Sequence, residues 1–410
     1  MKEAASALTQ QDAQDNSLTL GHLALALGLV LVGMGQTLLY ALLGPATRQI
    51  GLSELQTGAI VSASALVLTV ASPFWGRRID KIGSRFVFLV GMFSYAVGSV
   101  AFAMTLDAGS RAVFSATLAF ATLVLIRVVY AFMTAGIHPA AMANIALTTA
   151  AEMRPARMAL MSACFGVGST LGPLLGSALG SFGLLVPLYA VSGMALLSVL
   201  FGSVALKRND AIASANRSAR TAKHLSAFDR RVLPPLIATV LTYVGFSALQ
   251  QSLSFHVQDL LKLDAGEAVK QTGIVVSGLA AAMVVTQLGI LQYVKPKPKM
   301  AVSVGATLTV VGLIGIATWA DSMVKMTACS VFCGAGFAFT FPGLQSALSS
   351  SVEEAEQGSV AGLSFGAAAL GYVVGPLLGT GLLSVGHGIT YWCAAVLVML
   401  AAFASQIRNS

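Results

Sequence analysis

The sequence predicts an all-helical integral membrane protein whose twelve spans form two pseudo-symmetric six-helix bundles. Three observations support this fold class. Of the 410 residues, 56% are hydrophobic and only 10% are charged, whereas an ordinary soluble domain carries about 25% charged residues. The apolar residues occur in runs of about 20, the length that an α-helix needs to cross the hydrocarbon core. A short amino-acid motif in the first half of the chain recurs in the second half. This composition excludes a soluble globular enzyme and a disordered chain.

Charged or turn-forming residues divide the apolar sequence into twelve runs, each of which we expect to span the membrane. In order, the expected spans are 20–46, 55–76, 85–106, 114–145, 157–182, 184–206, 233–257, 271–293, 300–320, 324–349, 358–383 and 388–407. We expect residues 1–19 to be an N-terminal tail, since they lack the pattern of a signal peptide. Residues 207–232 are expected to link bundles at 20–206 and 233–407.

The basic residues predict which side of the membrane each loop faces. With the N-terminus in the cytoplasm, 18 of the 24 Lys and Arg residues fall in cytoplasmic segments and five fall on the opposite side. Cytoplasmic loops carry an excess of positive charge, so we expect both termini to be cytoplasmic. Because these charges are spread over loops at one membrane face, the net charge of +8 predicts contact with a lipid bilayer and not with nucleic acid.

The two halves of the chain repeat one another. The sequence GPLLG occurs at Gly172–Gly176 and again at Gly375–Gly379, an offset of 203 residues, and Pro139 matches Pro342 at the same offset. Several matches at one offset near half the chain length indicate duplication of a six-helix unit. Parallel repeats joined by a linker are typical of two-half transporters.

A charged motif lies between the second and third spans, reading G-R-R-I-D-K-I-G-S-R from Gly76 to Arg85. Glycine permits a tight turn, and Asp80 can accept charge-assisted hydrogen bonds from arginines or cap a neighbouring helix. The motif resembles the loop signature of the major facilitator superfamily, although Ser84 stands where a basic residue is usual. By this resemblance, five residues are expected to latch the inner gate: Gly76, Asp80, Lys81, Gly83 and Arg85. The alternative is that the charges only set the orientation.

The fourth span contains an arginine, Arg127, among apolar residues. A charge at membrane depth costs at least a few kcal/mol, so it normally faces the bundle interior and marks a pathway. His138 lies eleven residues later on nearly the same helix face and titrates near neutral pH. We therefore take Arg127, His138 and Asp80 as candidates for proton coupling. The alternatives are a structural pairing of Arg127 and a neutral hydrogen bond between helices at His138.

The fifth span is rich in glycine and resembles the antiporter motif in the fifth span of twelve-helix drug:proton antiporters. Glycines at four-residue spacing let neighbouring helices touch closely, and a proline bends the span. The motif residues are Gly168, Gly172, Pro173 and Gly176. The resemblance implies export. The copy of the pattern in the eleventh span indicates a role in helix packing as well.

No Asp or Glu lies well inside a span, although many proton antiporters of this family carry such a carboxylate. This departure is compatible with neutral or anionic cargo. Polar and aromatic residues inside the spans are expected to line a central cavity, because a buried amide needs a partner. These candidates are Gln36, Tyr40, Arg127, His138, Tyr243, Phe246, Gln250, Gln251, Gln287 and Gln345. The alternative for each aromatic residue is packing against lipid.

The resemblance implies a secondary active transporter that works by alternating access in the inner membrane of a bacterium. We expect proton-coupled export of small amphiphilic organic compounds, that is, drug efflux. The alternative is a transporter, in either direction, for a specific anionic metabolite or siderophore. The chain lacks hydrolase, zinc-protease and phosphate-binding motifs, so we expect no enzyme activity, metal or cofactor. Energy would come from the proton gradient, and one chain supplies a complete cavity, so we expect a monomer.

Overall fold

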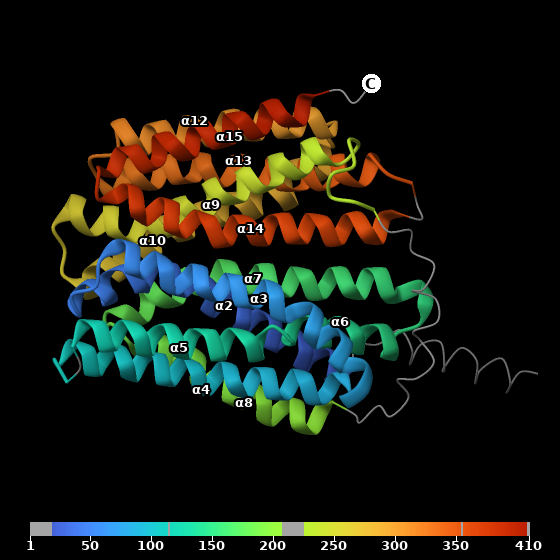
Figure 1. Ribbon diagram of the computed structural model, residues 1–410, viewed down its shortest axis with the longest axis horizontal. Coiled ribbons are helices and arrows are strands. Elements are labelled where there is room, and N and C mark those ends of the chain that lie inside the picture. Colours follow the sequence, from blue (N-terminus) through green and yellow to red (C-terminus); the bar gives the residue numbers. More distant parts are fainter. Residues whose placement is uncertain (1–18, 114, 207–224, 354–355, 408–410) are drawn as a thin grey trace, which may run out of the picture.

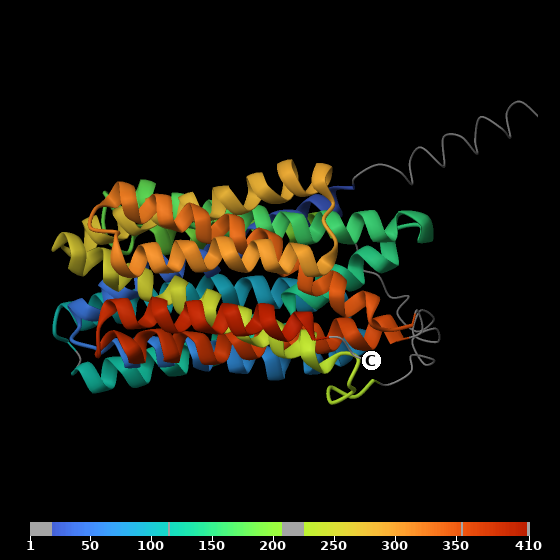
Figure 2. The ribbon, with the colours of Figure 1, turned by 90° about the horizontal axis from the view of Figure 1, so that it is seen from above.

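The computed structural model describes residues 19–113, 115–206, 225–353 and 356–407. Within these ranges, twelve spans are long and apolar enough to cross a membrane, so the predicted fold class is confirmed. Nearly all of the expected tail at 1–19 and most of the expected linker at 207–232 lie outside the described residues. Figures 1 and 2 show the spans running roughly along one common axis.

The described spans form two bundles, which lie one above the other in Figure 1. The N-terminal bundle consists of α2 (Leu20–Gln49), α3 (Glu54–Ile82), α4 (Ser84–Ser110), α5 (Ala116–Thr134), α6 (Ile137–Thr148), the 3₁₀ turn η1 (Ala151–Met153), α7 (Arg154–Gly180) and α8 (Val186–Ala205). The C-terminal bundle consists of α9 (Leu233–Leu261), α10 (Ala265–Val285), the π-helical segment η3 (Thr286–Ile290), α11 (Leu291–Val294), α12 (Pro298–Thr318), α13 (Met323–Ser350), α14 (Gln357–Leu383) and α15 (His387–Gln406).

Several helices extend beyond the apolar runs that predicted them. The second span was expected to end at residue 76, but α3 continues to Ile82 and includes most of the charged motif that was expected to be a loop. A helix satisfies its own backbone hydrogen bonds in water as well as in lipid, so charged residues do not end it. The chain turns at Gly83, whose φ of +91° suits glycine.

Two spans that were predicted as single helices are interrupted. The fourth span breaks between α5 and α6 at Ala135 and Gly136. A Cβ at Gly136 would lie 2.6 Å from a methyl carbon of Val87 and 3.1 Å from the ring of Trp75, so glycine allows close packing there. In the eighth span, η3 inserts a π-helical turn between α10 and α11. Hydropathy reports only how apolar a run is, and it does not report where packing interrupts the helix.

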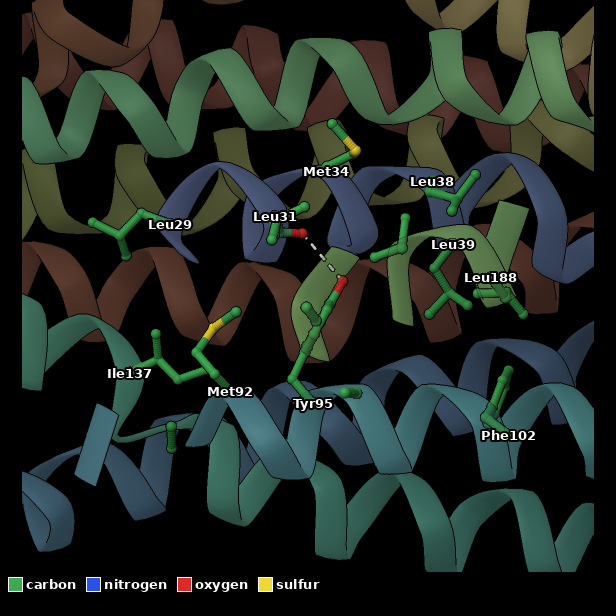
Figure 3. Close-up of a cluster of buried hydrophobic side chains, with 14 of the residues drawn as sticks. Leu29, Leu31, Met34, Leu38, Leu39, Met92, Tyr95, Phe102, Ile137 and Leu188 are labelled. Atoms are coloured by element: carbon green, nitrogen blue, oxygen red, sulfur yellow. Dashed lines mark hydrogen bonds between the residues drawn. The ribbon is translucent and has the colours of Figure 1, made fainter. Parts of the chain in front are cut away.

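The core of the N-terminal bundle forms around α2, which packs against α7, α8 and α4. Tyr95 of α4 is almost fully buried, and its hydroxyl donates to the carbonyl oxygen of Leu31 at 3.2 Å, as Figure 3 shows. Leu29, Leu38 and Met92 belong to the same cluster of buried side chains. The hydrogen bond satisfies the one polar atom of a large apolar side chain, so this ring fixes the distance between α2 and α4.

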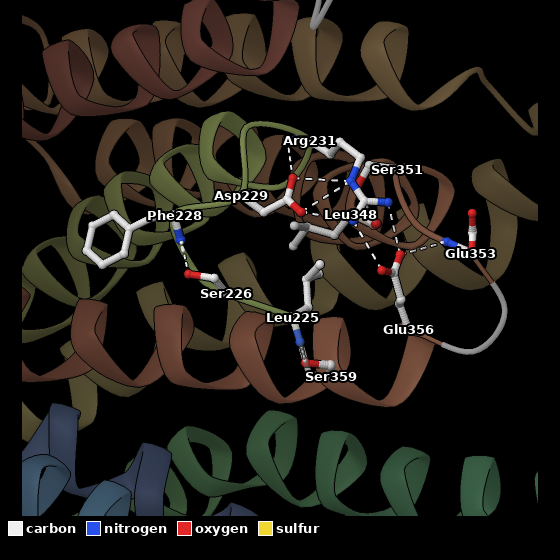
Figure 4. Close-up of polar contacts among 10 residues, drawn as sticks. All are labelled: Leu225, Ser226, Phe228, Asp229, Arg231, Leu348, Ser351, Glu353, Glu356 and Ser359. Atoms are coloured by element: carbon white, nitrogen blue, oxygen red, sulfur yellow. Dashed lines mark hydrogen bonds and ion pairs between the residues drawn. The ribbon is translucent and has the colours of Figure 1, made fainter. Parts of the chain in front are cut away.

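The described end of the expected linker packs against the C-terminal bundle. Leu225 is buried, and its backbone N–H donates to the Ser359 hydroxyl at 3.0 Å. Figure 4 shows Arg231 between two carboxylates, with ion pairs of 2.9 Å to Asp229 and 3.0 Å to Glu356. Since the Glu356 side chain is only 2% exposed, this pair holds the start of α9 to the loop before α14.

The bundles meet at one end of the molecule, which we call the closed end. There α3 packs on α14, α7 on α10 and α2 on α9. The opposite end, which we call the basic end, carries the exposed side chains of Arg77, Arg78 and Lys81. Toward the basic end, Gly166 of α7 and Gly362 of α14 have no neighbouring atom within 4 Å of a Cβ position. The space between the bundles therefore opens toward the basic end.

Candidate functional site

A cavity that could hold a small molecule lies in the C-terminal bundle, in the half of the molecule nearer the basic end. Its volume is about 530 Å³, within the range of small-molecule sites. It is lined by Tyr243, Gln287, Leu291, Gln292, Phe341, Pro342 and Gln345. The structure thus brings together three of the predicted cavity residues, Tyr243, Gln287 and Gln345, although the first and last are 102 positions apart in the sequence. None of the seven lining residues is charged.

Aromatic rings form one surface of this cavity. The Tyr243 ring stacks on Phe341 with centroids 4.5 Å apart and planes 20° apart, and Tyr372 lies 5.6 Å from Tyr243. Phe246 meets the edge of Phe341 at 5.2 Å and is itself buried. Such a cluster offers a flat apolar face to a planar ligand. Sequence reasoning missed Phe341, although its spacing of four from Phe337 puts both rings on one helix face.

Amide side chains supply the polar part of the cavity. Gln287 is exposed and lies in the π-helical segment, a rare geometry that often marks functional sites. Gln345 accepts a hydrogen bond from the Ser364 hydroxyl at 2.8 Å through its Oε1 atom. This contact orients the amide and leaves its N–H groups available to a ligand. Together with Gln292, these groups can donate and accept hydrogen bonds without adding charge.

Two other predicted cavity residues, Gln250 and Gln251, are buried in α9. Gln251 is fully buried, and neither of its amide atoms has a hydrogen-bond partner among the described residues. An unsatisfied buried amide costs about 1–3 kcal/mol. The structure therefore does not bring these two amides to the surface that Gln287 and Gln345 share.

On the N-terminal side, the predicted residues are more dispersed. Gln36 is exposed in the middle of α2 although helices of both bundles surround α2, so its side chain faces interior space and not lipid. Tyr40, one turn later, is buried. His138 is exposed at the start of α6 and stacks on Phe165 of α7 with centroids 6.3 Å apart. Gln36 and His138 thus both lie outside the aromatic cavity, on the N-terminal bundle.

Arg127 lies inside the N-terminal bundle. Its Nε donates to the Ser64 hydroxyl at 2.9 Å, and its guanidinium carbon lies 4.9 Å from the Tyr130 ring centroid and 5.7 Å from that of Phe102. It borders an enclosed space of about 20 Å³, room for one water molecule. In the described part of the chain it forms no ion pair. Arg127 does not line the larger cavity, and its role in coupling stays a prediction.

The glycine motif of the fifth span lies at helix contacts. A Cβ at Gly168 would overlap the carbonyl of Val30, and one at Gly172 would overlap the carbonyl of Met34, so both glycines set the distance between α7 and α2. Gly176 faces Leu38 in the same interface, and the Pro173 carbonyl approaches α10 of the other bundle.

At the basic end, Asp80 and Lys81 are exposed on the last turns of α3, before Gly83. Arg85 donates to the Ser203 carbonyl at 2.6 Å and so joins α4 to α8. Gly76 has no neighbour within 4 Å of its Cβ position. In this arrangement the motif lies where the bundles are apart, and its role as a latch stays a prediction.

Comparison with known proteins gives consistent matches over most of the chain. Residues 25–376 match the sequence model of the Major Facilitator Superfamily. Multidrug resistance protein 2 of Bacillus subtilis is 25% identical over 349 residues, which cover 80% of each chain. Quinolone resistance protein NorA of Staphylococcus aureus is 21% identical over 359 residues, which cover 87% of this chain and 88% of the relative. A solved D-xylose-proton symporter shares the fold, with a TM-score of 0.73 and 15% identity over 94% of this chain and 96% of its own.

Proposed function

The chain belongs to the Major Facilitator Superfamily, and on this premise we propose that it exports small, planar amphiphilic compounds from a bacterial cytoplasm in exchange for protons. The observation that carries the proposal is the uncharged cavity in which Tyr243 and Phe341 offer stacked rings beside Gln287 and Gln345. Relatives named for multidrug and quinolone resistance support the same cargo class.

The proposal includes an orientation. Among the described residues, the basic end carries most of the loop arginines and lysines, which favours the cytoplasmic side and would place both termini there. The cavity then opens to the cytoplasm, where an exporter collects its cargo. The protein acts as a monomer in the inner membrane, needs no bound cofactor and draws energy from the proton gradient. The Asp80 motif latches the basic end when the bundles close there.

Binding follows from the cavity chemistry. A planar ring that slides beside the Tyr243–Phe341 pair gains aromatic contact of about 0.5–1.5 kcal/mol beyond its buried area. The amides then orient polar substituents, and each neutral hydrogen bond adds about 0.5–1.5 kcal/mol. Because no carboxylate lines the cavity, a cation gains no direct ion pair there. We therefore expect neutral or zwitterionic planar compounds to bind better than simple cations of the same size.

The test is proton flux in proteoliposomes that contain a pH-sensitive dye and are challenged with planar neutral, cationic and anionic compounds. Export predicts proton movement opposite to the cargo. Gln287→Ala and Tyr243→Ala should each raise the half-saturating concentration about tenfold, which corresponds to 1.4 kcal/mol. Gln49→Ala is the matched control, because that exposed amide lies at the far end of α2.

Three results would contradict the proposal. If Gln287→Ala and Tyr243→Ala behave like Gln49→Ala, the cavity is not the cargo site. If only anionic compounds move protons, the protein is instead a carrier of an anionic metabolite or siderophore, and Arg127 becomes the candidate for recognition. Movement of cargo and protons in the same direction would identify an importer.

A further inference from the structure

A network of charged groups joins the two bundles at the closed end. Arg48, near the end of α2, forms two parallel hydrogen bonds with Asp259 of α9, at 2.5 Å from Nη1 to Oδ1 and 2.8 Å from Nη2 to Oδ2. Its Nη2 also reaches Glu54 of α3 at 2.8 Å. The guanidinium lies 4.7 Å from the Phe255 ring centroid. A two-pronged arginine–carboxylate pair is strong and directional, so this contact holds the bundles together.

A histidine shares the carboxylate of this contact. Nε2 of His387, the first residue of α15, lies 3.2 Å from Asp259 Oδ2, the same oxygen that accepts from Arg48 Nη2. The His387 ring stacks on His256 with centroids 5.1 Å apart, and His256 Nδ1 lies 3.0 Å from the Tyr391 hydroxyl. The groups that face His387 are thus Asp259, His256, Tyr391 and, across Asp259, Arg48 and Glu54.

The closed arrangement provides an acceptor for only one of the two ring nitrogens of His387 among the described residues. A neutral ring with its proton on Nε2 donates to Asp259, and its Nδ1 atom is then unprotonated. His387 Nδ1 is buried and has no hydrogen-bond partner among the described residues, so a second proton there would create a buried donor without an acceptor. That proton would also add a positive charge beside Arg48, which competes for the same oxygen. The closed end thus offers no acceptor to a proton on Nδ1, and Arg48 already donates to the oxygen that His387 shares.

Separation of the bundles changes the partners of His387 and Asp259. Arg48 belongs to the N-terminal bundle, whereas Asp259 and His387 both belong to the C-terminal bundle. When the closed end opens, Arg48 leaves with α2 and Glu54 remains near it on α3. Of its described partners, Asp259 then keeps His387 alone, and water reaches Nδ1 of the His387 ring. A protonated His387 then neutralises the carboxylate within its own bundle.

From this geometry we propose that His387 is a proton-binding site whose occupation releases Arg48 from Asp259 and opens the closed end. The proton comes from the solution that the closed end faces and binds at Nδ1 of the ring. Because linkage is reciprocal, opening also draws the proton in. The role of this proton site in transport rests on the proposed function. In a proton-driven exporter, the site would bind protons on the side of the membrane where cargo leaves.

The test measures opening without any cargo or gradient. Spin labels at Ser110→Cys and Val324→Cys, both exposed near the closed end on opposite bundles, report the separation in a background without native cysteines. From pH 8 to pH 5, the longer-distance population should rise by up to tenfold per pH unit, the limit for one proton. His387→Gln should abolish this response, whereas Arg48→Gln should open the end at both pH values.

His256→Gln is the matched control, because that ring stacks on His387 without touching Asp259, and it should keep the pH response. Loss of the response in His256→Gln but not in His387→Gln would overturn the assignment. An unchanged response in His387→Gln, in protein that elutes as a single species, would overturn it as well. Because no cargo is present, these outcomes are independent of whether the protein exports drugs.

Discussion

Replacing Gly58 with alanine should wedge the closed end open. A Cβ at this position of α3 would lie 2.7 Å from the carbonyl oxygen of Pro376 on α14 and would overlap the Thr380 hydroxyl. Thr380 cannot turn aside freely, because it is only 1% exposed and its hydroxyl donates to that same carbonyl at 2.7 Å. The two helices belong to different bundles, so relief requires the bundles to move apart.

The size of the effect follows from the overlap. Ordinary contact begins at 3.4 Å, so the α14 backbone must retreat by about 0.7 Å from its present 2.7 Å. Overpacking of this kind costs about 1–3 kcal/mol, which corresponds to a roughly 5- to 150-fold shift toward the open arrangement. The better helix propensity of alanine, about 1 kcal/mol, acts on α3 in either arrangement and does not offset the shift.

The assay is the distance distribution between spin labels at Ser110→Cys and Val324→Cys. Gly193→Ala is the control, since this glycine of α8 has no atom within 4 Å of its Cβ position and α8 packs within one bundle. We expect Gly58→Ala to enlarge the longer-distance population and Gly193→Ala to leave it unchanged. Superimposable distributions for the two variants would refute the reasoning.

Three further predictions concern the bundles themselves. Gly168→Ala should lower the free energy of unfolding by about 1–3 kcal/mol, because its Cβ would overlap α2. Gly166→Ala is the control and should leave the free energy of unfolding unchanged, because no atom lies within 4 Å of its Cβ position. Equal melting temperatures of the two variants in detergent would contradict this prediction. Arg127→Lys keeps the charge but loses the planar fork, so proton flux should fall at least tenfold; a matching loss of thermal stability would instead indicate a structural role. The Arg231 guanidinium lowers the pKa of Asp229, so this pair stabilises the fold above about pH 3.9 and is lost as the pH falls through the lowered pKa. The melting difference between Asp229→Asn and the unmodified protein should therefore shrink from pH 7 to pH 3, and a constant difference would count against the pair.

Hydropathy was sufficient to predict the twelve spans, because crossing a bilayer demands a long apolar run whatever the tertiary contacts. It could not predict where α3 ends, since the helix runs on through charged residues to Ile82. Nor could it predict the break at Gly136 or the π-helical segment at Thr286–Ile290. Those features depend on packing against other helices, which a single sequence does not report.

The candidate site was only partly predictable for the same reason. Gln287, Gln345 and Tyr243 stand out as polar or aromatic residues in apolar spans, and they meet at one cavity. Gln251 stands out equally, but it points into the bundle. Residue type alone cannot separate these cases, because the face that a side chain occupies depends on which neighbouring helices cover it.

The closed-end network was missed for a different reason. Arg48, Asp259 and His387 lie near the ends of three spans, where a charged residue is unremarkable and is counted toward orientation. Arg48 and Asp259 are 211 positions apart in the sequence, and nothing in the local sequence links the three residues. The packing of both α2 and α15 against α9 brings them together.

The aromatic rings and amides of the cavity belong to the C-terminal bundle, whereas Gln36 and His138 lie apart from it on the N-terminal bundle. A molecule stacked on Tyr243 travels with the C-terminal bundle when the bundles rock, while its other end exchanges neighbours. Substitutions of the aromatic rings should therefore change affinity equally in both halves of the transport cycle. Substitutions of Gln36 or His138 should change the ratio of the two affinities, and it is this ratio that determines how steep a concentration gradient the protein can sustain.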